Sequence, residues 1–322
     1  MTVDPNPDGP GAQAPDAGRA GDTEHAPAPA RSRSRPHAQA EARARVADAH
    51  ALADAWDAAA GVRTRPAEVG DLDGIVERME ATWGPGRSPD RAFLRALSHA
   101  GSTVLVAVPA DGAPDPAAVP LGAAVGFLGW SDGLHLHSHM NAVDPSSRGH
   151  GIGVALKLRQ RAACLEHGVD EIRWTFDPLI RRNAYFNLVR LGAEVAAYHR
   201  DFYGDLRDAI SGGDVSDRFE VRWRLDAPRT RRALAHGPDL VRAAAGARPR
   251  RRRHWPAWAA DGEALELVAD FEAVRIESPV VAAELRARSR TVFDDAFARG
   301  LRPELVVSGD YVFTADDPDR EA

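Results

Sequence analysis

The stretch Arg148-Gly149-His150-Gly151-Ile152-Gly153 decides how this sequence folds, because it joins an apolar run that ends at Val143 to a helix-patterned run that extends to His167. A strand that leads through a glycine-rich turn into a helix places unpaired backbone N–H groups, and the positive end of the helix dipole, around one small volume. The glycines let the backbone approach an anion closely, and Arg148 adds a fixed positive charge beside it. The stretch therefore predicts a phosphate-binding turn.

Three other interpretations of this turn have less support. A nucleotide triphosphatase would need Gly-Lys-Ser/Thr after the last glycine, but Gly153 is followed by Val154. A dinucleotide fold would need the spacing G-x-G-x-x-G, which is absent, although Asp170 lies near the expected acidic position. Glycines that serve only the conformation of a turn remain the third alternative.

The residues after the turn predict a helix over 154–167 and then a strand. The apolar positions recur at helical spacing: Val154, Ala155, Leu158, Ala162 and Leu165. The other face carries Lys157, Arg159, Gln160 and Arg161. Gly168 can end the helix, and residues 171–176 alternate as a strand before Asp177-Pro178. Strand, turn, helix and strand form a βαβ unit, whose two strands normally run parallel.

Composition indicates a cytoplasmic protein without nucleic acid or membrane as a partner. The 322 residues include 41 Lys+Arg against 47 Asp+Glu, a formal net charge of −6. The first residues show no basic and apolar leader pattern, and no stretch has the length of apolar residues that a membrane span needs. Cys164 is the only cysteine, which agrees with a reducing compartment and favours a packing role. Lys157 is the only lysine, which we interpret as a bias of composition.

The chain is expected to contain three regions. Residues 1–60 form a disordered tail, to about residue 36, and an alanine-rich helix over 38–60 that packs loosely. Residues 61–227 form an α/β domain with a mixed central sheet flanked by helices, and residues 228–322 form a linker and a small appended subdomain. Expected strands of the middle region cover 62–65, 103–108, 121–130, 134–143, 171–176, 193–202 and 219–225, with helices over 71–80, 89–100, 154–167 and 183–191. The last region is expected to have an arginine run over 248–253, strands over 265–276, a helix over 278–299 and a strand pair over 305–313.

Three histidines mark the strand before the turn. His135, His137 and His139 share one face of a strand, because side chains at i, i+2 and i+4 point the same way. Such a face can hold zinc, as in a metal-dependent hydrolase, or a general base. No carboxylate at ligand spacing lies close by, so we expect no metal. His139 is the best candidate for a base because it lies nearest the turn.

The pattern R-x-x-G-x-G and several further motifs resemble the GNAT superfamily of N-acetyltransferases, in a poorly characterised bacterial branch. The matching residues are Ser138-His139-Met140, Trp174-Thr175-Phe176-Asp177-Pro178-Leu179, Arg182-Asn183-Ala184 with Asn187, Leu191-Gly192, Tyr203-Gly204 and Ser216-Asp217-Arg218 with Trp223. The resemblance implies an acyl-CoA co-substrate, acetyl-CoA or another thioester such as succinyl-CoA, whose pyrophosphate the turn cradles. It also implies that pantetheine lies along Met140, Asn141, Ala142 and Val143 like an added strand, and that an amine attacks the thioester directly.

The sequence departs from the superfamily pattern at the acid that protonates the leaving thiolate. The tyrosine that often has this role would fall at Leu188, which cannot donate a proton. Tyr185, about one turn earlier on the same helical face, is a possible substitute, and packing is its other interpretation. Asn183 and Asn187 are expected to orient the pantetheine or the acceptor. Asp177 is either a turn cap or a carboxylate that faces the acceptor.

The sequence therefore predicts an N-acyltransferase that acts on the primary amine of a small molecule, as a monomer or a homodimer. Arg181, Arg182 and Arg200 could pair with carboxylates of the acceptor. The alternative is a module that binds acyl-CoA without chemistry and acts as a sensor through a partner; the leucine at 188 favours it, and the histidine strand disfavours it.

Overall fold

The computed structural model describes residues 35–111, 118–204, 213–235, 237–238, 264–306, 308–317 and 319. The chain divides into two compact units, residues 1–40 and 41–322, and the fold described below is that of the second unit. Most of the tail for which we predict disorder, and the arginine run over 248–253, lie outside the described residues.

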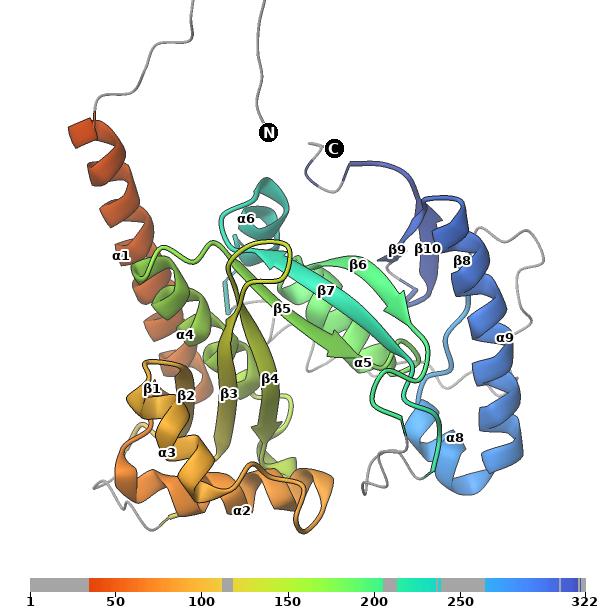
Figure 1. Cartoon of the computed structure of the whole chain (residues 1–322), viewed down its shortest axis with the longest axis horizontal. Helices are drawn as coiled ribbons and strands as arrows, with labels where there is room; N and C mark the ends of the chain where they lie inside the picture. Colours follow the sequence, from red (N-terminus) through yellow and green to blue (C-terminus); the bar gives the residue numbers. More distant parts are fainter. Residues whose placement is uncertain are drawn as a thin grey trace, which may run out of the picture. The chain divides into compact units, whose positions relative to one another are not determined.

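A seven-stranded mixed sheet forms the centre of the second unit (Figure 1). Its strands are β1 (Val62–Pro66), β2 (Thr103–Pro109), β3 (Gly122–Gly129), β4 (His135–Val143), β5 (Glu171–Phe176), β6 (Glu194–His199) and β7 (Arg218–Arg224). Their order is β1-β2-β3-β4-β5-β7-β6, and the pair β4 and β5 is parallel whereas the other neighbours are antiparallel. The predicted mixed α/β sheet and its parallel βαβ unit are confirmed.

Helices cover both faces of this sheet. They are α1 (Arg35–Ala60), η1 (Val69–Asp71), α2 (Leu72–Trp83), α3 (Arg91–His99), η2 (Pro145–Ser147), α4 (Ile152–Glu166), α5 (Arg181–Ala184), the π-helical turn η3 (Tyr185–Arg190) and α6 (Pro228–Leu234). Ile75 and Met79 of α2 and Leu94 of α3 are buried in one core with residues of β2 and β3. A second and larger core lies on the opposite face, between the sheet, α4 and α1. Apolar side chains on both sides of the strands thus give the sheet two buried faces.

Helix α4 is buried almost all round, including most of the face that carries its polar residues. Lys157, Gln160 and Arg161 are buried. Lys157 and Gln160 face the sheet, where both contact Ser138 of β4. Helix α1, which we expected to pack loosely, lies against another side of α4: its residue Trp56 is buried in the core, and Arg159 Nη2 donates to Asp57 Oδ2 at 2.9 Å. The N-terminal helix therefore seals the outer side of α4.

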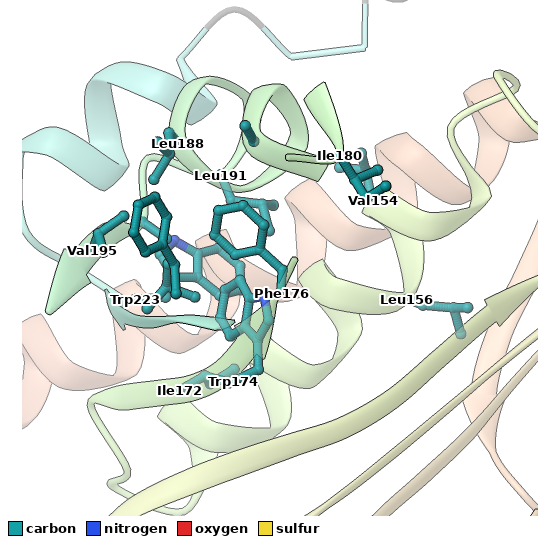
Figure 2. Close-up of a cluster of buried hydrophobic side chains, with 14 of the residues drawn as sticks. Val154, Leu156, Ile172, Trp174, Phe176, Ile180, Leu188, Leu191, Val195 and Trp223 are labelled. Atoms are coloured by element: carbon teal, nitrogen blue, oxygen red, sulfur yellow. The ribbon is translucent and has the colours of Figure 1, made fainter. Parts of the chain in front are cut away.

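The part of the larger core beneath α4 is rich in aromatic residues (Figure 2). Trp174 of β5 and Trp223 of β7 meet edge to face with ring centroids 6.1 Å apart. Leu188 and Leu191, which follow α5, close this cluster from the other side in Figure 2. This packing holds β5 and the segment after it in fixed positions beside α4.

The C-terminal segment packs on the same unit. It contains β8 (Ala264–Leu265), α8 (Phe271–Glu277), α9 (Pro279–Ala298), β9 (Arg302–Leu305) and β10 (Tyr311–Thr314), with the three strands in the order β8-β10-β9. The helix and the strand pair agree with the sequence, but the strands predicted over 265–276 are wrong beyond Leu265. Asp270 accepts a hydrogen bond from Ala273 N at 3.0 Å and begins a helix there. Tyr311 is buried and donates to Pro178 O at 2.9 Å, which ties the segment to the end of β5.

None of the helices in the described part of the chain is long and apolar enough to cross a lipid bilayer.

Candidate functional site

The parallel strands β4 and β5 separate soon after they meet. They pair at Leu136 opposite Ile172 and at His137 opposite Arg173, and no further pairing between them occurs in the described residues. On its other side, β4 has a β-bulge at His139, because Ser138 lies opposite Gly126 and Met140 opposite Val125. Because β4 and β5 no longer pair beyond His137, the backbone of residues 138–143 on the edge of β4 that faces β5 is available for hydrogen bonds.

The predicted phosphate turn lies directly beyond this edge and has the conformation that its glycines suggest. Gly149 and Gly151 have φ angles of 86° and 92°, in the left-handed region that other residues rarely adopt. The amides of residues 149–151 donate to no acceptor in the described part of the chain, and neither do those of Ile152 and Gly153, the first two residues of α4. Several N–H groups therefore point into one volume, beside the exposed side chain of Arg148.

A cavity of about 1350 Å³ begins at this turn and continues along the free edge of β4. It reaches the point beyond His137 and Arg173 where β4 and β5 separate, which we call the fork. Nearly all of the residues predicted for the site line it. They are His139, Met140, Asn141, Ala142, Val143, Arg148, Gly149, Gly151, Ile152, Gly153, Asp177, Asn183, Tyr185 and Asn187. His150 is the exception: its side chain is exposed, and its ring Nδ1 lies 3.2 Å from Ser147 O.

The histidines of β4 gather around Phe127 of β3. The His137 ring lies 5.3 Å from the Phe127 ring and 6.1 Å from the His139 ring. The side chain of His139 is exposed, but partial desolvation by the surrounding protein lowers its pKa below the usual value. Burial together with its neighbours lowers the pKa of His137 to about 4. Both rings are therefore neutral at neutral pH, as a base requires. Within the described ranges, no group of three or more His, Cys, Asp or Glu side chains could hold a metal ion.

Asp177 is held in an ion pair at the rim of the cavity. Leu179 N donates to its Oδ1 at 3.0 Å, which makes it the turn cap that the sequence suggested. Arg286 of α9 donates to both carboxylate oxygens at 2.8 Å and also to Asp214. Burial alone would raise the pKa of Asp177, but Arg286 outweighs it and holds the pKa below its usual value. The oxygens of Asp177 are thus occupied within the fold.

The π-helical turn η3 separates residues that an ordinary helix would place on one face. Leu188 is buried in the core, whereas Tyr185 is 41% exposed at the cavity and lies 5.7 Å from the Arg190 guanidinium. Tyr185 and Leu188 therefore do not share a face, contrary to the expectation from helical spacing. Asn187 is buried and accepts a hydrogen bond from Trp174 Nε1 at 3.1 Å.

The arginines expected to pair with an acceptor carboxylate have partners inside the fold. Arg182 pairs with Glu272, Arg200 pairs with Asp294, and Arg181 donates to Ser308 O. Of these arginines, Arg182 lines the cavity. At the far end of the cavity, Thr175 Oγ1 and Tyr203 Oη are 3.1 Å apart, and the Arg218 guanidinium lies 5.4 Å from the Tyr203 ring.

Sequence reasoning missed Lys157. Its Nζ donates to Ser138 Oγ at 2.7 Å and lies 3.7 Å from the centroid of the Trp174 ring. All three side chains line the cavity. Burial lowers the pKa of Lys157 to about 7. The signal in the sequence was its rarity, a single lysine among 41 basic residues, which we attributed to composition.

Comparison with known proteins gives matches among solved structures. A scan against models of protein families gives no match, and neither does a search of curated proteins. Ard1 from Thermoplasma volcanium matches with 18% identity and a TM-score of 0.37, over 50% of this chain and 96% of that one. Naa50 from Arabidopsis thaliana matches with 17% identity and a TM-score of 0.40, over 50% of this chain and 97% of that one.

A further similar structure is the ribosomal-protein-S18-alanine N-acetyltransferase from Escherichia coli, with 15% identity and a TM-score of 0.39, over 51% of this chain and 94% of that one.

Proposed function

We propose that this protein is an N-acyltransferase that moves an acyl group from acyl-CoA to an amine. The observation that carries the proposal is the turn at 149–151, whose positive-φ glycines and unpaired amides open into a cavity that follows the free edge of β4. The turn suits a diphosphate, because several N–H donors and the α4 dipole meet there. The free edge of β4 suits an extended chain that carries amide groups.

A buried atom beside this edge supports the fit of pantetheine. Asn141 donates through Nδ2 to Gly153 O at 3.4 Å, and its Oδ1 is buried without a hydrogen-bond partner in the structure. A buried acceptor without a partner costs stability, and an amide N–H of pantetheine would satisfy it. Pantetheine supplies the thioester when bound, and the fork between β4 and β5 gives the acyl group a passage towards His139.

His139 is the base in this proposal. It lies at the bulge of β4, it lines the cavity, and its lowered pKa keeps it neutral at neutral pH. A neutral imidazole can take the proton that the acceptor ammonium must lose before its nitrogen attacks. The acceptor end of the cavity carries the hydroxyl groups of Thr175 and Tyr203, 3.1 Å apart, which can bind polar groups of an acceptor, so we propose the primary amine of a small molecule as the acceptor.

The second candidate function is a sensor that binds acyl-CoA without turnover. The burial of Leu188 favours it, because the position at which the superfamily often has its acid faces the core. Calorimetry with CoA and a thiol-release assay with acetyl- or succinyl-CoA and a panel of amines separate the two. Amine-dependent release that falls in His139→Ala supports the transferase, tight binding without release supports the sensor, and failure to bind CoA removes both.

A further inference from the structure

We propose that Lys157 is the catalytic acid that protonates the departing CoA thiolate, an inference that rests on the proposed acyltransferase function. Leu188 lies in the core, and the carboxylate of Asp177 is bound to Arg286. Lys157 therefore provides the proton donor that the superfamily position lacks.

The position of Lys157 places it at the fork. Its Nζ contacts Ser138 of β4, the first residue beyond the β4–β5 pairing, and the ring of Trp174 of β5. The ammonium thus bridges the two strands at the point where they separate, at the inner end of the free edge of β4. A chain laid along that edge from the phosphate turn reaches Lys157 last, where its reactive end would be.

Lys157 and His139 approach this point from opposite faces of the sheet. Ser138 points to the α4 side, where Lys157 binds it, and strand alternation directs His137 and its cross-strand partner Phe127 to the other side. His139 lies with these rings, 6.0 Å from Phe127. A base on one face and an acid on the other can serve the attacking amine and the leaving sulfur at the same time.

A chain of hydrogen bonds fixes the direction in which the lysine acts. Ser138 Oγ donates to Gln160 Oε1 at 2.8 Å, and Gln160 Nε2 donates to Thr103 Oγ1 at 3.1 Å. Because the serine proton is committed to Gln160, the serine oxygen accepts from Lys157. One N–H of Lys157 is therefore held by Ser138, and the other N–H groups remain to face the cavity.

The proton balance of the step is complete. The neutral amine nitrogen forms a bond to the thioester carbon, the C–S bond breaks, and its electron pair goes to sulfur. The proton on Lys157 Nζ moves to that sulfur, which leaves a neutral lysine and the CoA thiol. The acceptor nitrogen loses two protons in all: His139 takes the first before the attack and passes it to solvent in the cavity, and it then takes the second from the nitrogen that has bonded to carbon. Solvent in the cavity then returns a proton to Lys157.

The acidity of Lys157 suits this transfer. An ordinary lysine has a pKa of about 10.4, above the pKa of about 8.5 that is typical of a thiol. Transfer of its proton to the thiolate would therefore cost free energy. Burial brings the pKa of Lys157 to about 7, which makes the transfer downhill. The titratable groups that interact with it are Cys164 of α4, which favours the charged form, and His137 of β4, whose own pKa the lysine lowers.

The pKa of the thiol of bound CoA tests the proposal without any acceptor. In Lys157→Arg, the guanidinium stays charged while the thiol titrates and should lower this pKa by about one unit or more relative to Lys157→Met, as measured by the ultraviolet absorbance of the thiolate across pH. The wild type should resemble Lys157→Met, because its lysine is already neutral at the pH where the thiol titrates. Both variants should bind CoA within about threefold of the wild-type affinity.

Turnover with an amine that the wild type accepts supplies the second measurement. We expect kcat to fall by about 10²-fold or more in both variants, since arginine does not give up a proton in this range. A thiol pKa that is the same in Lys157→Arg and Lys157→Met would overturn the assignment, as would full activity of Lys157→Arg. Loss of CoA binding by the wild type would instead remove the proposed function itself.

Discussion

Replacing Lys157 by methionine should change the pH dependence of stability in a predictable way. The lysine is 3% exposed, and burial lowers its pKa from 10.5 to about 7. The folded protein therefore loses this proton above about pH 7, whereas the unfolded chain keeps it until about pH 10. Because the unfolded state binds more protons in between, the wild type gains stability as the pH rises through this range.

The pKa difference sets the size of the effect. Each unit corresponds to about 1.4 kcal/mol, so the charged lysine costs the fold up to about 5 kcal/mol, part of which its contacts with Ser138 and the Trp174 ring offset. Methionine carries no proton and has no such dependence. The wild type should therefore gain about 2 kcal/mol in free energy of unfolding relative to Lys157→Met between about pH 7 and about pH 9.

Urea unfolding of the CoA-free protein, followed by tryptophan fluorescence at several pH values, measures this difference. Arg159→Met is the matched control, because it removes a cation from the same helix whose pKa is raised, not lowered. His137, with a pKa of about 4, does not titrate in this window, and the ionisation of Cys164 in the unfolded chain is common to both proteins. A stability difference between the wild type and Lys157→Met that stays constant with pH would refute the lowered pKa.

Three further changes test other parts of the site. Gly151→Val should weaken CoA binding by about tenfold or more in calorimetry, because φ is 92° and a Cβ would lie 3.3 Å from the Trp56 ring; unchanged affinity would count against the turn. Arg286→Met should lower the free energy of unfolding by about 3 kcal/mol, since it removes two hydrogen bonds from buried Asp177 and leaves Arg275 at 3.5 Å as the remaining cation, and a loss below about 1 kcal/mol would contradict this ion pair. His139→Ala should reduce amine-dependent thiol release by about 10²-fold with CoA affinity preserved, and retained turnover would exclude His139 as the base.

The sequence alone determined the central sheet and the turn. The spacing of apolar residues predicted the strands of the mixed sheet to within a few residues, because each strand is bounded by glycine, proline or aspartate. The conformations of Gly149 and Gly151 could also be predicted, since the need for positive φ is local to the chain. Local signals were overlooked at residues 265–276, where Asp270 caps a helix that we had interpreted as strands.

Tertiary structure alone decided the surroundings of α4. Helical periodicity showed that Lys157, Arg159 and Arg161 lie off the apolar stripe, but it could not show whether solvent or protein covers that side. The sheet covers Lys157, through Ser138 and Trp174, and helix α1 covers Arg159, through contacts between residues about a hundred positions apart, such as Arg159 with Asp57. Helix α1, which we expected to pack loosely, therefore contributes to the core around α4.

The same reason explains Asp177 and Lys157. The partner of Asp177 is Arg286, more than a hundred residues away in a segment whose role the sequence did not reveal. The fork that places Lys157 between Ser138 and Trp174 exists because two parallel strands pair briefly and then diverge. Local spacing specifies which residue types stand near a turn, but burial and the pKa of a side chain depend on which distant elements enclose it.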